Sequence, residues 1–166
     1  QGKILKDVGA QLSCQYEEIP DKVNLLNATV KKYVQKQTAL TKELAAAEAQ
    51  DIIAKIKANT EIVSAFRADS SPEYMNALQK EVTTIAKKES LKLNEHTLIM
   101  ANGENKTGGA IKITGPRAGE VGEQVMKILS NTKAGAVRGN VFLAKILGFE
   151  KGEVTSLTKY FETLSV

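Results

Sequence analysis

The stretch GGAIKITGPRAGEVGEQVMKILSNTKAGAVRGNVFLAKILG, residues 108–148, decides how this chain folds. It predicts a strand over 110–114 that runs out of a double glycine, and then a helix over 118–129 whose apolar residues recur at helical spacing. A second, glycine- and lysine-containing strand follows, centred on 141–146. The order strand, helix, strand indicates an α/β unit.

Positive charges gather beside the glycines of this stretch, against only Glu120 and Glu123. Glycine next to Lys or Arg lets phosphate groups approach main-chain N–H groups as well as the cationic side chains. The pattern favours a nucleic-acid surface, and on composition alone a solvated basic surface is an equal alternative. The predicted phosphate contacts are Lys106, Lys112, Arg117, Lys133, Arg138 and Lys145, and the glycines expected to allow close approach are Gly108, Gly109, Gly135 and Gly139.

The segments around this stretch extend the α/β pattern. A β-prone run covers 61–68, and Ser-Ser-Pro-Glu at 70–73 predicts the start of a helix that continues through 74–88. A strand over 97–101 and a closing helix over 154–164 complete the series. Residues 59–166 are therefore predicted to form an α/β domain with one small mixed sheet.

Residues 1–58 are predicted to form a helical arm. Between Val23 and Ala58 there is no Gly or Pro, so one long helix is expected over 20–58, after a shorter one over 4–12. At 1.5 Å per residue the long helix reaches roughly 55 Å and needs a partner. An identical subunit or a missing part of the chain is favoured over a hairpin with the first helix. The coiled-coil-like seam comprises Val23, Leu26, Val30, Tyr33, Leu40 and Leu44.

Composition sets the broad class of this 166-residue chain. A net charge of +4 favours an acidic partner. The single cysteine cannot form an internal disulfide, and no apolar run is long enough to span a membrane, so a cytoplasmic protein is expected. The chain begins at Gln1 without Met or a signal-like segment, which suggests a fragment of a longer polypeptide.

Catalytic chemistry has little support in this sequence. A catalytic zinc needs about three protein ligands, and the chain has one histidine, His96, and one cysteine, Cys14. No phosphate-binding loop, hydrolase nucleophile motif or dinucleotide fingerprint is present. We predict no catalytic residue and no metal ligand here. The GPRAG segment at 115–119 is interpreted as a tight turn, with a ligand contact through backbone N–H groups as the less favoured alternative.

The order of the segments resembles a known family. The helix EIPDKVNLLNATVKKYVQKQTALTKELAAAEAQDII (18–53) precedes PEYMNAL (72–78), GENKTGGAIKITGP (103–116) and NTKAGAVRGNVFLAKILGF (131–149). These segments are similar to the C-terminal half of alanyl-tRNA synthetases, and more so to the eukaryotic long form of the free-standing alanyl-tRNA editing proteins (AlaX type). The resemblance runs from Val8 to the terminal helix.

The resemblance implies a parent hydrolase that removes mischarged serine or glycine from tRNA(Ala). Its zinc is expected in an upstream editing domain that is not in this chain, so no cofactor is expected here. The C-terminal domain of the family, of the type associated with DHH phosphoesterases, is linked to tRNA contact and dimerisation. The family's glycine run is reduced here to SNTKAGAVRGN (130–140).

Two functions therefore compete. The leading hypothesis is a non-catalytic module that binds and positions tRNA, with tRNA(Ala) as the expected partner, through salt-sensitive phosphate contacts with little base readout. The alternative is a structural dimerisation module of a synthetase-like protein, in which the arm forms a homodimer and the basic surface has no RNA contact. Both can hold together, since a dimer doubles the available phosphate contacts.

Overall fold

The structure is a computed structural model of the chain, and it describes residues 2–104, 108–129, 134–146 and 148–165. The chain divides into two compact units, Gln1–Leu40 and Thr41–Val166. The predicted boundary lay after residue 58. It falls earlier because Ala45, Ala49 and Ile52 of the long helix are buried in the core of the second unit.

The first unit is helical. It contains α1 (Gly2–Gln11), a 3₁₀ turn at Tyr16–Glu18 and the start of α2 (Ile19–Lys57). The backbone N–H of Gln15 donates to Oε2 of Glu18 at 3.0 Å and caps the entry into the turn. The long uninterrupted helix predicted from the lack of Gly and Pro is confirmed.

The second unit is built on one five-stranded sheet with the order β1-β2-β3-β5-β4. Strand β1 pairs with β2 in parallel, and the other pairs are antiparallel, so the sheet is mixed as predicted. The strands are β1 (Ile62–Arg67), β2 (Thr97–Glu104), β3 (Gly108–Thr114), β4 (Ala134–Arg138) and β5 (Val141–Ile146).

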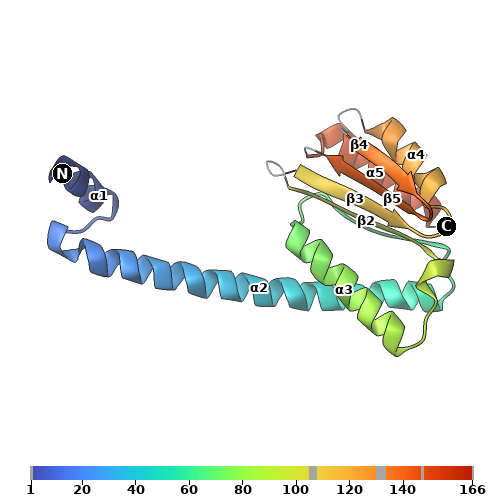
Figure 1. Cartoon of the computed structure of the whole chain (residues 1–166), viewed down its shortest axis with the longest axis horizontal. Coiled ribbons are helices and arrows are strands. Elements are labelled where there is room, and N and C mark those ends of the chain that lie inside the picture. Colours follow the sequence, from blue (N-terminus) through green and yellow to red (C-terminus); the bar gives the residue numbers. More distant parts are fainter. Residues whose placement is uncertain (1, 105–107, 130–133, 147, 166) are drawn as a thin grey trace. The chain divides into compact units, whose positions relative to one another are not determined.

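Helices cover both faces of this sheet (Figure 1). Helices α4 (Ala118–Ile128) and α5 (Lys151–Leu164) bury their apolar sides on one face, over a core that includes Ile99, Ile111 and Leu157. On the other face, α3 (Pro72–Lys88) and the end of α2 pack over β1 and β2. The two cores follow from strand alternation, which sends successive side chains to opposite faces.

Local sequence explains where the helix α3 begins. Ser71 is its N-cap, and the Ser71 hydroxyl accepts a hydrogen bond from the backbone N–H of Tyr74 at 3.3 Å. Pro72 occupies the first turn, where its missing N–H has no cost.

Gly115 ends β3 for a steric reason. It has φ +123°, and a Cβ there would lie against backbone atoms of His96 and Thr97. Only glycine satisfies both the positive φ and this close approach of two chain segments.

One strand was not predicted as a separate element. Strand β4 joins β5 through the two residues Gly139 and Asn140, and Gly139 has φ +59°. A Gly-Asn pair between two strands is typical of a β-hairpin, and Ala134–Arg138 forms the first strand of this one. No helix among the described residues is long and apolar enough to cross a membrane.

Candidate nucleic-acid interface

One face of the sheet is covered over only part of its width. Strand β5 alternates between exposed and buried residues. Its buried residues join the core beneath α4 and α5, and its exposed residues are Val141, Leu143 and Lys145. Leu143 is 44% exposed, which is unusual for a leucine in a sheet that has helices on both faces.

The strand register brings three of the predicted cations onto this face. Lys112 of β3 lies opposite Leu143, and Arg138 of β4 lies opposite Val141. Directly opposed residues of antiparallel strands share a face, so both side chains join Lys145. We call Lys112, Arg138 and Lys145, with Val141 and Leu143 between them, the open face.

The open face exists because α3 covers only the other half of the sheet. The buried residues of α3 pack with Val63 and Ala65 of β1 and with Leu98 of β2. No described helix packs over the outward residues of β5, which stay exposed.

Two adjoining hollows lie where α3 meets the open face. Their volumes are about 280 and 290 Å³. Both are lined by Gln79 of α3, Met100 of β2, and Lys112 and Val141 of the open face. A groove with an apolar floor and a lysine at its wall can hold part of an anionic ligand.

The three cations of the open face have unneutralised charge. Within the described parts of the chain, Lys112, Arg138 and Lys145 form no ion pair. Their charges are therefore available to an external anion, and a phosphate backbone is such an anion.

Asn102 adds an unused donor beside these cations. It lines one of the two hollows, is 5% exposed, and its Nδ2 has no hydrogen-bond partner among the described residues. A buried amide group without a partner costs free energy, which an acceptor atom of a ligand would recover. The sequence analysis did not select Asn102, because only the fold shows that its side chain is buried without a partner.

Arg117 lies apart from the open face. Its guanidinium donates to both carboxylate oxygens of Glu120, with Nη2 at 2.7 Å from Oε1, and its Nη1 lies 3.6 Å from Oε1 of Glu61. The hydrogen bond from Arg117 lowers the pKa of the Glu120 carboxyl below its ordinary range. Arg117 is the N-cap of α4 and belongs to none of the strands of the open face, and its charge is already compensated by Glu120 and Glu61.

The remaining predicted contacts divide into two groups. Lys106 and Lys133 lie outside the described residues. Two of the four glycines have a packing role instead of an open backbone: a Cβ at Gly109 would overlap the carbonyl oxygen of Asn102, and a Cβ at Gly135 would lie 2.7 Å from the sulfur of Met126. Gly139 is in open space in the hairpin turn, and Gly108 begins β3 opposite Glu104.

The predicted seam residues of α2 are solvent-exposed. Their exposed fractions range from 39% at Val23 to 67% at Tyr33. Leu25 and Val34, which the heptad pattern did not include, are exposed as well. The seam comprises Val23, Leu26, Val30, Tyr33 and Leu40 in the first unit and Leu44 in the second.

No metal-binding cluster forms from the described residues. His96 sits at the entrance of β2, is buried, and its Nδ1–H donates to the carbonyl oxygen of Thr60 at 2.7 Å. Cys14 belongs to the other unit. In the part of the chain that the structure describes, no three His, Cys, Asp or Glu side chains could hold a metal ion, so these residues do not fit the zinc site of an editing domain.

Comparison with known proteins gives no assignment. No protein-family model matches the sequence, and a search of curated proteins finds no significant match.

Proposed function

We propose that this chain is a non-catalytic tRNA-binding and positioning module of a cytoplasmic alanyl-tRNA editing protein. In this proposal its second unit is a domain of the DHH-associated type. Hydrolysis of mischarged Ser- or Gly-tRNA(Ala), with its zinc, belongs to an editing domain outside this chain. The observation that carries the proposal is the placement of Lys112, Arg138 and Lys145, without ion-pair partners among the described residues, on one open face.

The arrangement supports phosphate contact more than base readout. Lys and Arg neutralise phosphates without distinguishing sequence. The open face has no aromatic side chain on which a base could stack, since its apolar residues are Val141 and Leu143. The ligand is therefore a folded RNA recognised by its backbone and shape, which describes the body of a tRNA.

Salt-dependent binding of tRNA(Ala) tests this proposal. Three phosphate contacts give a slope of log affinity against log salt of about −2 to −3. Lys145→Glu and Arg138→Glu should each weaken binding and reduce that slope by about one. The matched control is Lys159→Glu, which makes the same charge change at an exposed lysine of α5, on the opposite face.

The outcomes separate the hypotheses. Unchanged affinity and slope in both open-face variants would exclude this face as the RNA site. Equal losses in all three variants would indicate a response to net charge alone. A preference for tRNA(Ala) over an unrelated tRNA would connect the module with alanyl-tRNA editing, and no preference would leave a general RNA module.

A second function is favoured by the exposed seam of α2. Apolar residues spaced three and four apart on a helix form a coiled-coil seam when a second helix covers them. The alternative is therefore a structural homodimerisation module of a synthetase-like protein, with no direct RNA contact. Light scattering should give a dimer mass that Leu26→Lys reduces to the monomer mass, while Lys22→Glu, an exposed charge change on the same helix, should not. A monomer mass for the native chain would reject the seam.

A further inference from the structure

The strand β1 forms an unpaired edge of the sheet. It is the first strand in the order β1-β2-β3-β5-β4, and among the described strands it pairs with β2 alone. Edge strands present unused N–H and C=O groups to any extended chain that approaches them. Natural proteins usually protect such an edge with charged side chains or Pro. The β1 sequence IVSAFR contains no Pro and no Lys, and its one charged residue, Arg67, is paired with Glu48.

The outward backbone groups of β1 can be assigned. The backbone N–H of Thr97 donates to the carbonyl oxygen of Glu61 at 2.9 Å, so Glu61 directs its carbonyl toward β2. Alternate residues of a parallel strand direct their backbone groups to opposite sides. Ser64 and Phe66 lie an odd number of residues after Glu61, so they direct their N–H and C=O groups to the open edge, away from β2.

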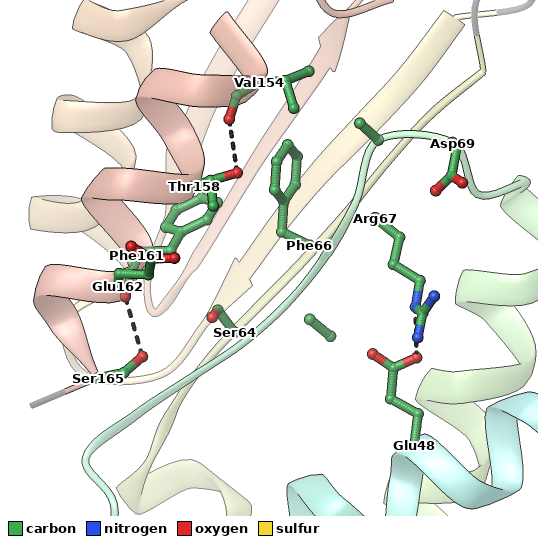
Figure 2. A pocket seen from close by; sticks show the side chains of 12 residues that line it. Glu48, Ser64, Phe66, Arg67, Asp69, Val154, Thr158, Phe161, Glu162 and Ser165 are labelled. Atoms are coloured by element: carbon green, nitrogen blue, oxygen red, sulfur yellow. Dashed lines mark hydrogen bonds and ion pairs between the residues drawn. The ribbon is translucent and has the colours of Figure 1, made fainter.

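A groove of about 670 Å³ follows this edge. Figure 2 shows β1 crossing between α5 on one side and Glu48 of α2 on the other. On the α5 side, Phe66 packs edge-on against Phe161 with ring centroids 5.5 Å apart, and Val154 lies nearby. The α5 side of the groove therefore has an apolar part, formed by Phe161 and Val154.

The groove is acidic and rich in acceptors. Three carboxylates line it, Glu48, Asp69 and Glu162, and Arg67 is the one cation among its described lining residues. Arg67 is already paired, because its Nε donates to Oε2 of Glu48 at 3.0 Å. Asp69 and Glu162 have no cation within ion-pair distance in the described part of the chain.

The hydroxyl groups of the α5 wall also act as acceptors. The Thr158 hydroxyl donates to the carbonyl oxygen of Val154 at 2.8 Å, and the Ser165 hydroxyl donates to that of Phe161 at 3.1 Å. Each hydroxyl hydrogen is used within α5, so only oxygen lone pairs face an incoming group. A matching ligand must supply hydrogen-bond donors and positive charge.

We propose that the edge of β1 is a docking site for an extended basic peptide segment of another protein, which adds a sixth strand to the sheet. Its backbone pairs with the outward groups of Ser64 and Phe66. Alternate side chains of an added strand point to opposite faces, so one set faces α5. Lys or Arg side chains of this set lay their aliphatic stems against Phe161 and Val154, and they bring their charges to Glu162 of the same helix and to Asp69, which follows β1.

Charge distinguishes this occupant from two others. RNA is repelled by Asp69 and Glu162, so this groove is separate from the basic open face. A second copy of β1 would bring the same carboxylates toward their counterparts, and like charges disfavour that pairing. A basic peptide gains both the backbone hydrogen bonds and the ion pairs.

Binding of a synthetic peptide to the full chain tests the proposal. The probe is a fluorescein-labelled hexapeptide of alternating Lys and Val with blocked ends, measured by fluorescence anisotropy at 50 mM salt. One control peptide replaces each Lys by Glu, and the other methylates alternate backbone nitrogens so that it cannot pair as a strand. We expect the unmodified peptide to bind at least about tenfold more tightly than either control, with chemical-shift changes at the amides of Ser64 and Phe66.

Two variants of the chain make the test specific. Glu162→Lys changes an exposed residue, should leave the fold intact, and should weaken peptide binding about fivefold. Its matched control, Glu123→Lys, changes an exposed residue of α4 and should leave binding unchanged. Ser64→Pro removes an outward N–H while keeping the β1–β2 ladder, and should abolish the pairing; its thermal unfolding verifies the fold.

The opposite outcomes would overturn the proposal. No binding at 50 mM salt, equal binding of the N-methylated peptide, or unchanged amide shifts over 62–67 would each exclude strand addition at β1. Equal effects of Glu162→Lys and Glu123→Lys would exclude the acidic groove as the source of affinity. A dimer mass of the chain that Ser64→Pro abolishes would assign the edge to a second copy instead.

Discussion

Gly122→Ala should destabilise the second unit, although alanine is the better helix former. A Cβ at Gly122 of α4 would lie 2.5 Å from Cδ2 and 2.6 Å from Cγ of Phe142. That ring cannot move easily, because Phe142 is 2% exposed and its Cε2 would also lie 3.3 Å from a Cβ at Gly135. Gly135 and Gly122 thus create the space that a phenylalanine needs between β5 and α4.

The magnitude follows from two opposing effects. Replacing Gly by Ala within a helix stabilises it by about 1 kcal/mol. Forcing an extra carbon into a well-packed core costs about 1–3 kcal/mol. We use the upper half of that range because the buried ring of Phe142 has little room to move away from the added Cβ. The overlap with Phe142 therefore exceeds the helix gain, and we expect a net loss of about 1–2 kcal/mol.

The same helix offers a matched control. A Cβ at Gly119 would lie 3.9 Å from its nearest neighbour, Cγ1 of Val137, which is ordinary contact. Gly119→Ala should therefore keep the helix gain and stabilise the unit by up to about 1 kcal/mol. Urea unfolding followed by circular dichroism should place the two midpoints on opposite sides of the native value.

One result would refute this reasoning. If both variants are equally stable, Phe142 yields at no cost and the contact between α4 and β5 is not tight. The result bears on function, since the inward position of Phe142 fixes which residues of β5 face outward. A one-residue slip of β5 would turn Lys145 into the core and remove it from the open face.

Two further outcomes are expected. The side chain of Leu157 in α5 is fully buried, so Leu157→Ala should lower the free energy of unfolding by about 2–5 kcal/mol in the same urea assay. A loss below about 1 kcal/mol would mean that α5 does not cover this core. The pKa of the Glu120 carboxyl, measured by NMR titration, should lie below its ordinary range and should return to that range in Arg117→Gln. Because folding lowers this pKa, the contribution of Glu120 to stability is present above the unfolded-state pKa and is lost as the pH falls through the folded-state pKa. Equal titration of Glu120 in both proteins would disprove the pairing.

The sheet of the second unit presents surfaces of opposite charge. The open face has the cations Lys112, Arg138 and Lys145, and the β1 edge groove has the carboxylates Asp69 and Glu162, which form no ion pair with any described residue. In the strand order, β2 and β3 separate β1 from β5 and β4. A net charge of +4 for the whole chain conceals this separation, so net charge alone does not predict where an acidic or a basic partner binds.

Most of the fold could be predicted from local sequence. Absence of Gly and Pro predicts the long helix α2, apolar spacing predicts α3, α4 and α5, and four of the five strands were placed from β-prone runs. Strand β4 was missed because its AGAVR segment has a weak β pattern, and only pairing with β5 makes it a strand. The end of α2 was assigned to the arm because helical periodicity does not show against which unit a helix packs.

The sequence by itself determined the alternation of β5, which places Val141, Leu143 and Lys145 on one side of that strand, because successive side chains of any strand point to opposite faces. Only the tertiary structure decided which strands pair with β5 and which helices cover its outward residues. Long-range pairing placed β5 between β3 and β4 and so joined Lys112 and Arg138 to Lys145, while packing of α3 over β1 and β2 left that face open. Arg117 shows the same limit, since local helical spacing brings Glu120 beside it, whereas only the folded chain places Glu61 there.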